Sequence, residues 1–243
     1  MGKLKFFASV ASTLVTNLGT LRKTEKLTAE GKLAERDAIM NDFADKACAK
    51  FFRSANINIS MEGEENIPAG TCVFVANHQS MFDALVMLDF AKNNRPCGFI
   101  MKKEFEKVSL IKRWCAMLNC VFVDRQNPRE AVKALKAASA NLERGVSMVV
   151  FPEGTRTKDY PHISEFKNGA FKIAQSGKYP IVPVVLFDTG ARYEAAGKLT
   201  GGTVHIKVLP PVTLSGTDRH EYKQAAADLQ EIFTRELAAF HNV

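Results

Sequence analysis

Short apolar runs that alternate with helix-like segments constrain the fold of this chain more than any other feature. The runs begin near residue 55 and are short enough for strands; they fall at 57–61, 71–76, 97–101, 120–123, 146–151, 181–187 and 204–209. Several intervening segments have helical spacing, and one of them is opened by Pro128 and ended by Gly145. Because continuous apolar strands alternating with helices are typical of parallel sheets, the sequence predicts an α/β fold whose mostly parallel central sheet is flanked by helices.

Residues 1–54 contain no proline and have two stretches of helical apolar spacing. The first consists of Leu4, Phe7, Val10, Leu14 and Leu18, and the second of Ile39, Phe43, Ala47 and Phe51. Gly31 lies between them and predicts a break. We therefore expect an N-terminal helical hairpin over 1–54 and an α/β domain over 55–243. The first helix is too short and polar for a confident membrane span, and it suits either a membrane interface or the protein's own core.

The net charge of +7 favours an anionic partner, which could be nucleic acid, a phosphate-bearing substrate or an anionic membrane surface. The sequence has no basic stripe interleaved with aromatic residues and no nucleic-acid module, so nucleic acid is the least favoured of the three. The five cysteines are irregularly spaced and contain no C-x-x-C pair. This pattern predicts buried free thiols in a reducing compartment rather than disulfides.

Polar clusters directly follow three of the expected strands. Ligand sites of open parallel sheets form in the loops beyond the carboxyl ends of strands. The first cluster is 77–83, in which Asp83 follows His78 by five residues. A carboxylate bonded to one imidazole nitrogen fixes the tautomer and leaves the other nitrogen to take a proton from an alcohol. Alternatively, Asp83 caps the next helix and His78 is a structural loop histidine. No G-x-S-x-G segment is present, which argues against a serine hydrolase.

Arginines mark the other two clusters, Asp124-Arg125 and 152–156. A guanidinium group binds phosphate in a bidentate geometry, so Arg125 and Arg156 together could form a phosphate-selective pocket. Each arginine could instead pair with its acidic neighbour, Asp124 or Glu153. Gly154 would allow the backbone to approach a ligand closely, and Glu153 could hold an arginine or contact a substrate hydroxyl. Lys102 follows a strand and would either add charge to this pocket or remain a solvated lysine.

In order and separation, these segments resemble the motifs of the glycerolipid acyltransferase family, in particular its bacterial 1-acylglycerol-3-phosphate acyltransferases. The N-H-x₄-D motif corresponds to 77–83, the K-x-E segment to 102–105, the strand ending in D-R to 121–125, F-P-E-G-T-R to 151–156 and the V-P-V segment to 181–185. The resemblance covers about residues 55–210. One departure is the stretch 108–114, which lacks the proline and glycine that family members often have after the K-x-E segment. Its Trp114 suits a membrane interface or ordinary core packing.

The resemblance implies roles for particular residues. His78 would be the general base and Asp83 its partner, while Lys102, Arg125 and Arg156 would bind the acceptor phosphate at a site shaped by Glu153 and Gly154. The donor would be a fatty acyl thioester of coenzyme A or acyl carrier protein. The acceptor would be 1-acylglycerol 3-phosphate (lysophosphatidic acid) and the product phosphatidic acid.

The resemblance implies no metal and no bound cofactor. The lipid substrate, the basic excess and the N-terminal amphipathic helix together predict a peripheral or monotopic protein at the cytoplasmic face of the cell membrane, in contact with anionic lipid. Two other functions stay open on these grounds. One is acylation of glycerol 3-phosphate or another lysophospholipid, and the other is lipid binding without catalysis.

Overall fold

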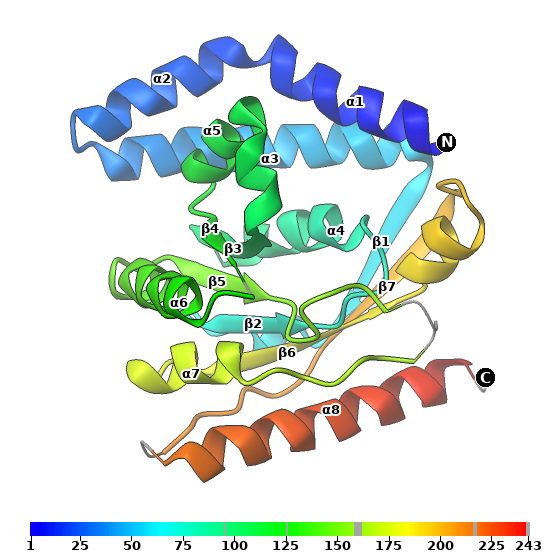
Figure 1. The fold of residues 1–243 in the computed structure, drawn as a ribbon. Coiled ribbons are helices and arrows are strands. Elements are labelled where there is room, and N and C mark those ends of the chain that lie inside the picture. Colours follow the sequence, from blue (N-terminus) through cyan, green and yellow to red (C-terminus); the bar gives the residue numbers. More distant parts are fainter. Residues whose placement is uncertain (95, 125, 158–161, 216–217, 242–243) are drawn as a thin grey trace.

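The computed structural model describes residues 1–243 apart from 95, 125, 158–161, 216–217 and 242–243. Within this described part, seven strands form one sheet in the order β1-β7-β6-β2-β5-β3-β4 (Figure 1). Their bounds are β1 (Ile57–Glu62), β2 (Val73–Ala76), β3 (Cys97–Lys102), β4 (Val121–Val123), β5 (Ser147–Val150), β6 (Ile181–Phe187) and β7 (Gly202–Val208).

The strands from β6 across to β4 run parallel to one another, and this confirms the predicted fold class. β7 is antiparallel to β6, while β1 pairs in parallel with β7, so the two strands at this end of the sheet run against the rest. The carboxyl ends of β2, β3, β4, β5 and β6 therefore meet at one edge of the sheet, which carries the predicted polar clusters.

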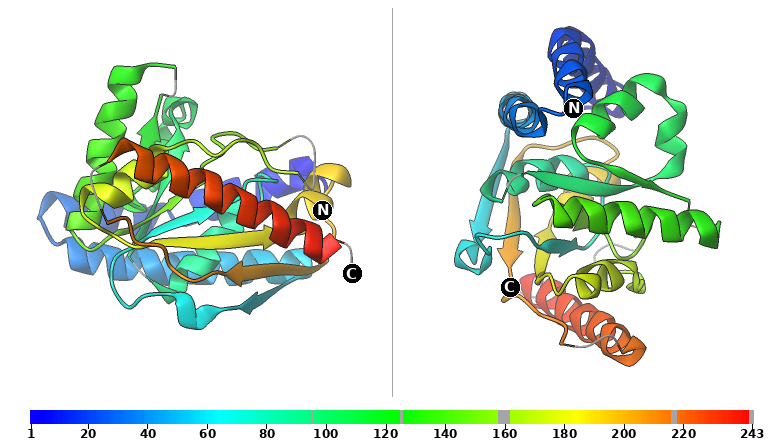
Figure 2. Two further views of the ribbon diagram at one scale, coloured as in Figure 1. Left: turned by 90° about the horizontal axis from the view of Figure 1, so that it is seen from below. Right: turned by 90° about the vertical axis from the view of Figure 1, so that its left-hand side faces the viewer.

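Helices pack on both faces of the sheet, as Figure 2 shows. The helices are α1 (Lys3–Thr16), α2 (Leu18–Ala29), α3 (Leu33–Ala55), α4 (Asp83–Phe90), α5 (Ser109–Met117), α6 (Pro128–Glu143), α7 (Gly169–Ser176) and α8 (Arg219–His241). The fully buried strand β2 contributes to two apolar clusters because its side chains alternate between the faces. Phe74 and Ala76 join the cluster of α3 and α4, whereas Val73 and Val75 join that of α6, α7 and α8.

The N-terminal helical hairpin is present. α1 and α2 form one arm, α3 forms the other, and Gly31 between them has a φ of +73°, which glycine adopts without strain. One residue, Asn56, separates α3 from β1, but the division into two domains stays a prediction. In the first predicted apolar face, Val10, Leu14 and Leu18 pack against apolar clusters, while Leu4 is 84% exposed and Phe7 is 49% exposed. Among the described residues, no helix has the length and apolar character to cross a membrane.

Trp114 lies in a small apolar cluster between α2, α3 and α5. It is only 2% exposed, and its ring stacks on Phe43 with the centroids 4.4 Å apart. The interpretation of Trp114 as a membrane-interface residue is therefore wrong, and core packing holds. The segment before Trp114 is divided by Val108, whose extended backbone separates the short helix η3 (Lys103–Lys107) from α5.

Candidate active site

The first polar cluster leaves the sheet at the end of β2, between β5 and β6. Asn77 is fully buried, and its side chain bonds the backbone of Leu186 in β6 in both directions: Leu186 N–H donates to Asn77 Oδ1 at 2.8 Å, and Asn77 Nδ2 donates to Leu186 O at 2.9 Å. The side chain of Asn77 thus takes the place of a further backbone pairing between β2 and β6. It fixes the direction in which the chain enters His78.

Asp83 begins α4 and is fully buried. One of its oxygens, Oδ2, accepts from the backbone N–H of Gln79 at 2.7 Å and of Ser80 at 2.8 Å, and it lies 2.8 Å from Nδ1 of His78. The loop thus folds back on itself, as the five-residue spacing required. The carboxylate of Asp83 does not cap α4, because this helix has no side-chain cap hydrogen bond and Oδ2 bonds the loop that precedes it.

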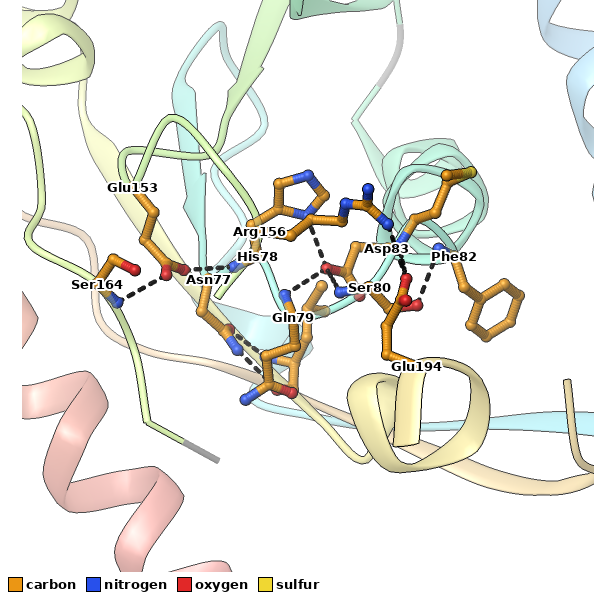
Figure 3. A network of polar contacts seen from close by, with 12 residues as sticks. Asn77, His78, Gln79, Ser80, Phe82, Asp83, Glu153, Arg156, Ser164 and Glu194 are labelled. Carbon is orange, nitrogen blue, oxygen red and sulfur yellow. Dashed lines mark hydrogen bonds and ion pairs between the residues drawn. The ribbon is translucent and has the colours of Figure 1, made fainter. Parts of the chain in front are cut away.

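The contact with Asp83 determines which ring nitrogen of His78 is available for chemistry. A carboxylate only accepts, so Nδ1 is the donor and Nε2 of the neutral ring keeps its lone pair. Nε2 lies on the side of the ring away from Asp83, and the side chain is 20% exposed (Figure 3). Nε2 of His78 is therefore left without a bond to Asp83 on a partly exposed ring, and the role of His78 as a base stays a prediction.

The loop that follows β5 holds His78 from the other side. Glu153 Oε1 accepts from the backbone N–H of His78 at 2.6 Å, and the N–H of Thr157 donates to the His78 carbonyl at 2.9 Å. The ring of Phe151 stacks on the imidazole with the centroids 4.3 Å apart and the planes 21° apart. Both backbone polar groups of His78 and one face of its ring are thus occupied by this loop.

Glu153 is only 1% exposed, and both of its oxygens accept from backbone N–H groups, since Ser164 N–H donates to Oε2 at 2.8 Å. Burial raises the pKa of Glu153, and the hydrogen bonds from Ser164 and His78 offset part of that rise. These contacts support the backbone of the histidine loop. The role of Glu153 in contacting a substrate stays a prediction.

Gly154 and Arg156 complete the loop. Gly154 has a φ of +74° and its N–H bonds Phe151 O at 3.1 Å, so this tight turn requires glycine. Arg156 has a 41% exposed side chain, and its Nη1 donates to Oε1 of Glu194 at 2.8 Å. Arg156 pairs with a residue from a distant segment, not with neighbouring Glu153.

The other two predicted phosphate ligands are less well defined. Lys102 ends β3, which β5 separates from β2, and its Nζ lies 3.0 Å from Glu104 Oε1 at the surface. The described contacts include no link between Lys102 and the His78 network. Arg125 lies outside the described residues. The assignment of both residues to a phosphate site stays a prediction.

Sequence reasoning missed Glu194 altogether. It lies in a π-helical turn, η4 (Gly190–Ala195), for which no element was predicted. The expectation that functional loops follow strands could have found it, because η4 follows β6 at the same sheet edge. The stacking of Phe151 on His78 was also missed, although Phe151 stood in a recognised motif.

The fold and the geometry of this site define a class of protein. It is an α/β protein in which a histidine, backed by a buried carboxylate, stands beyond the carboxyl end of a central parallel strand. The loop that supports it also carries an exposed arginine. Such a site suits removal of a proton from an alcohol beside an anionic group.

The chain belongs to the Acyltransferase family, whose sequence profile matches residues 58–187. It is 33% identical over 178 residues to a chloroplastic 1-acyl-sn-glycerol-3-phosphate acyltransferase of Brassica napus. The matched region covers 70% of this chain and 51% of the relative. It is also 33% identical over 152 residues to a probable 1-acyl-sn-glycerol-3-phosphate acyltransferase of Mycoplasma pneumoniae, covering 61% and 56% of the two chains. The chain spans about half the length of these curated relatives.

The fold is similar to the crystal structure of the 1-acyl-sn-glycerophosphate (LPA) acyltransferase PlsC from Thermotoga maritima. The TM-score is 0.71 at 25% sequence identity, and the match covers 94% of this chain and 98% of that one. The resemblance found in the sequence motifs is thus confirmed at the level of the family and its fold.

Proposed function

We propose that this protein transfers a fatty acyl group from an acyl thioester to the free hydroxyl of 1-acylglycerol 3-phosphate, giving phosphatidic acid. The observation that carries the proposal is the 2.8 Å contact between His78 Nδ1 and the buried carboxylate of Asp83, which leaves Nε2 available as a base. The names of the relatives from Brassica napus, Mycoplasma pneumoniae and Thermotoga maritima supply the reaction class and the acceptor.

The reaction needs one proton carrier. The acceptor hydroxyl donates to His78 Nε2 and attacks the thioester carbonyl, so that a C–O bond forms and the proton passes to the imidazole. When the tetrahedral intermediate collapses, the C–S bond breaks and the imidazolium returns the proton to the leaving thiolate. Asp83 stabilises the imidazolium throughout, and the supporting loop keeps the ring in place. Coenzyme A and acyl carrier protein are both suitable donors in this scheme.

The acceptor phosphate fits a site at Arg156, with Arg125 and Lys102 as further cations. Arg156 belongs to the same short loop as Glu153, which bonds the backbone of His78. A phosphate held at Arg156 would keep the acceptor near the base while its acyl chain extends away. Gly154 gives the loop the turn that brings these groups together.

A comparison of acceptors tests this proposal. Purified protein should acylate 1-acylglycerol 3-phosphate in preference to glycerol 3-phosphate, lysophosphatidylcholine and lysophosphatidylethanolamine, with acyl-coenzyme A and acyl carrier protein donors assayed side by side. His78→Ala should abolish transfer while binding of lipid vesicles is retained, and His220→Ala, at the exposed start of α8, is the matched control. A preference for glycerol 3-phosphate would show that the proposed acceptor is wrong. Full activity of His78→Ala would overturn the assignment of His78 as the base.

We also propose that the protein works at the cytoplasmic face of the membrane as a peripheral or monotopic protein. Leu4 and Phe7 are exposed apolar side chains on α1, and they alternate with the exposed Lys3 and Lys5. Such a helix suits an anionic lipid surface, since the apolar side chains enter the interface and the lysines meet the headgroups.

A further inference from the structure

We propose that Glu194 is a positioning residue that holds Arg156 where the acceptor phosphate meets it. The inference rests on the proposed function, because it concerns how a phosphate-bearing acceptor is bound. Glu194 lies outside the segment 58–187 that matches the family profile, and none of the recognised motifs contains it.

The contacts of Glu194 join three separate loops at the carboxyl edge of the sheet. Its Oε1 accepts from Nη1 of Arg156 at 2.8 Å and from the backbone N–H of Met81 at 3.1 Å. Met81 lies between His78 and Asp83 in the chain, and Arg156 lies in the loop after β5. Figure 3 shows the side chain of Glu194 reaching from η4 toward Arg156. One carboxylate oxygen therefore fixes the arginine relative to the histidine loop.

The segment that carries Glu194 is itself well anchored. The preceding residue, Tyr193, is 1% exposed, and its ring lies 5.2 Å from that of Phe6 in α1. Arg192 bonds the backbone of the following turn, with Nη1 donating to Gly201 O at 2.9 Å and its carbonyl accepting from Thr200 N–H at 2.8 Å. The carboxylate of Glu194 thus extends from a fixed support, and its 29% exposed side chain is only partly open to solvent.

A fixed support matters because Arg156 has a long and exposed side chain. Ordering such a side chain lowers its conformational entropy. Without Glu194, this cost would weaken the binding of the phosphate. The guanidinium group carries five N–H donors in a planar fork, so a bond from Nη1 to Glu194 leaves donors for a phosphate. Glu194 therefore orders the arginine in advance, and its effect should appear in acceptor binding rather than in the chemical step.

Two substitutions separate positioning from a purely structural role. Glu194→Ala removes both hydrogen bonds, and we expect it to raise the KM for 1-acylglycerol 3-phosphate about tenfold while kcat and the KM for the donor change less than about threefold. Glu194→Gln keeps an acceptor oxygen and should restore the acceptor KM to within about threefold of wild type. Glu236→Ala, on α8, breaks a 2.7 Å pair with Lys207 of β7; it is the matched control and should leave all three constants unchanged.

A double-mutant cycle tests the coupling to Arg156. Arg156→Ala should raise the acceptor KM. The double variant Arg156→Ala/Glu194→Ala should have an acceptor KM within about twofold of that of Arg156→Ala, because the two residues act as a unit. Additive effects, or an equal loss in both KM values and kcat, would overturn the inference. If wild-type protein acylates 1-acylglycerol 3-phosphate and Arg156→Ala weakens it but Glu194→Ala does not, the proposed function stands and the role of Glu194 is wrong. If the wild type acylates no phosphorylated acceptor, the proposed function itself fails.

Discussion

Replacement of Asp83 by asparagine is the sharpest test of the proposed base. The asparagine oxygen can take the place of Oδ2 and keep the bonds from Gln79 N–H and Ser80 N–H. The new NH₂ group would then occupy the place of Oδ1, an atom for which the described residues supply no hydrogen-bond partner. The loop can therefore keep its shape while the negative charge beside His78 is lost.

The expected size of the effect follows from the geometry. At an effective dielectric constant of about 20, unit charges about 4 Å apart attract by about 4 kcal/mol. The contact between Nδ1 and Oδ2 is 2.8 Å, but the His78 side chain is 20% exposed, so solvent screens part of the attraction. If the imidazolium loses about 2–4 kcal/mol of stabilisation in the transition state, kcat falls roughly 30- to 1000-fold.

The assay follows release of coenzyme A from an acyl donor, with 1-acylglycerol 3-phosphate supplied in mixed micelles. Asp89→Asn is the matched control, because Asp89 is on the same helix but pairs with Lys92 at 3.2 Å, away from the histidine. Circular dichroism and thermal melting should show that both variants fold. A kcat of Asp83→Asn within about threefold of wild type would refute the charge-stabilisation argument.

Three further predictions concern the support of the site and its approach to lipid. Asn77→Ala leaves the buried backbone groups of Leu186 unpaired and should lower the free energy of unfolding by about 2–4 kcal/mol in urea titrations, whereas an unchanged midpoint would contradict this. Burial raises the pKa of Glu153 above its ordinary value of 4.5, so its contribution to stability is present below that pH and is lost as the pH rises through the raised value. Between pH 4.5 and the raised pKa, wild type loses this stability and Glu153→Gln does not. The difference in free energy of unfolding between the two proteins should therefore shift in favour of the variant as the pH rises, and a difference independent of pH would count against the burial argument. Replacing both Leu4 and Phe7 by serine should weaken sedimentation with anionic vesicles at least about tenfold without a change in melting temperature, and equal binding would move the membrane contact elsewhere.

The sequence predicted the parts of the site that depend on strand ends and short spacings. The apolar runs defined the strands, and parallel strands bring the loops after β2 and β5 to one edge. The five-residue step from His78 to Asp83 was short enough for a loop to close on itself. Such features follow from local periodicity, and the structure places both residues in direct contact.

Features that depend on long-range packing could not be predicted in this way. The sequence alone allows Arg156 either to bind phosphate or to pair with its near neighbour Glu153. It does not show that Glu153 is buried against the histidine loop. The partner of Arg156, Glu194, comes from a turn 38 residues further along the chain. The reversal of β7 and the burial of Trp114 are also tertiary effects, since an apolar run does not specify strand direction or which neighbour covers a ring.

The support of His78 is divided among loops that follow three different strands, and this division has a consequence for specificity. Asp83, Glu153 and Phe151 act on the histidine itself, through its ring and its backbone, so changes at these three residues should affect every acceptor alike. Glu194 bonds Arg156 as well as the backbone N–H of Met81, and its neighbour Tyr193 packs against Phe6 of the N-terminal helix. We therefore expect sequence variation in η4 and α1 to alter where an anionic headgroup is held, while the contacts of the His78 ring with Asp83 and Phe151 come from other segments. This separation would allow one catalytic apparatus to serve different acceptors.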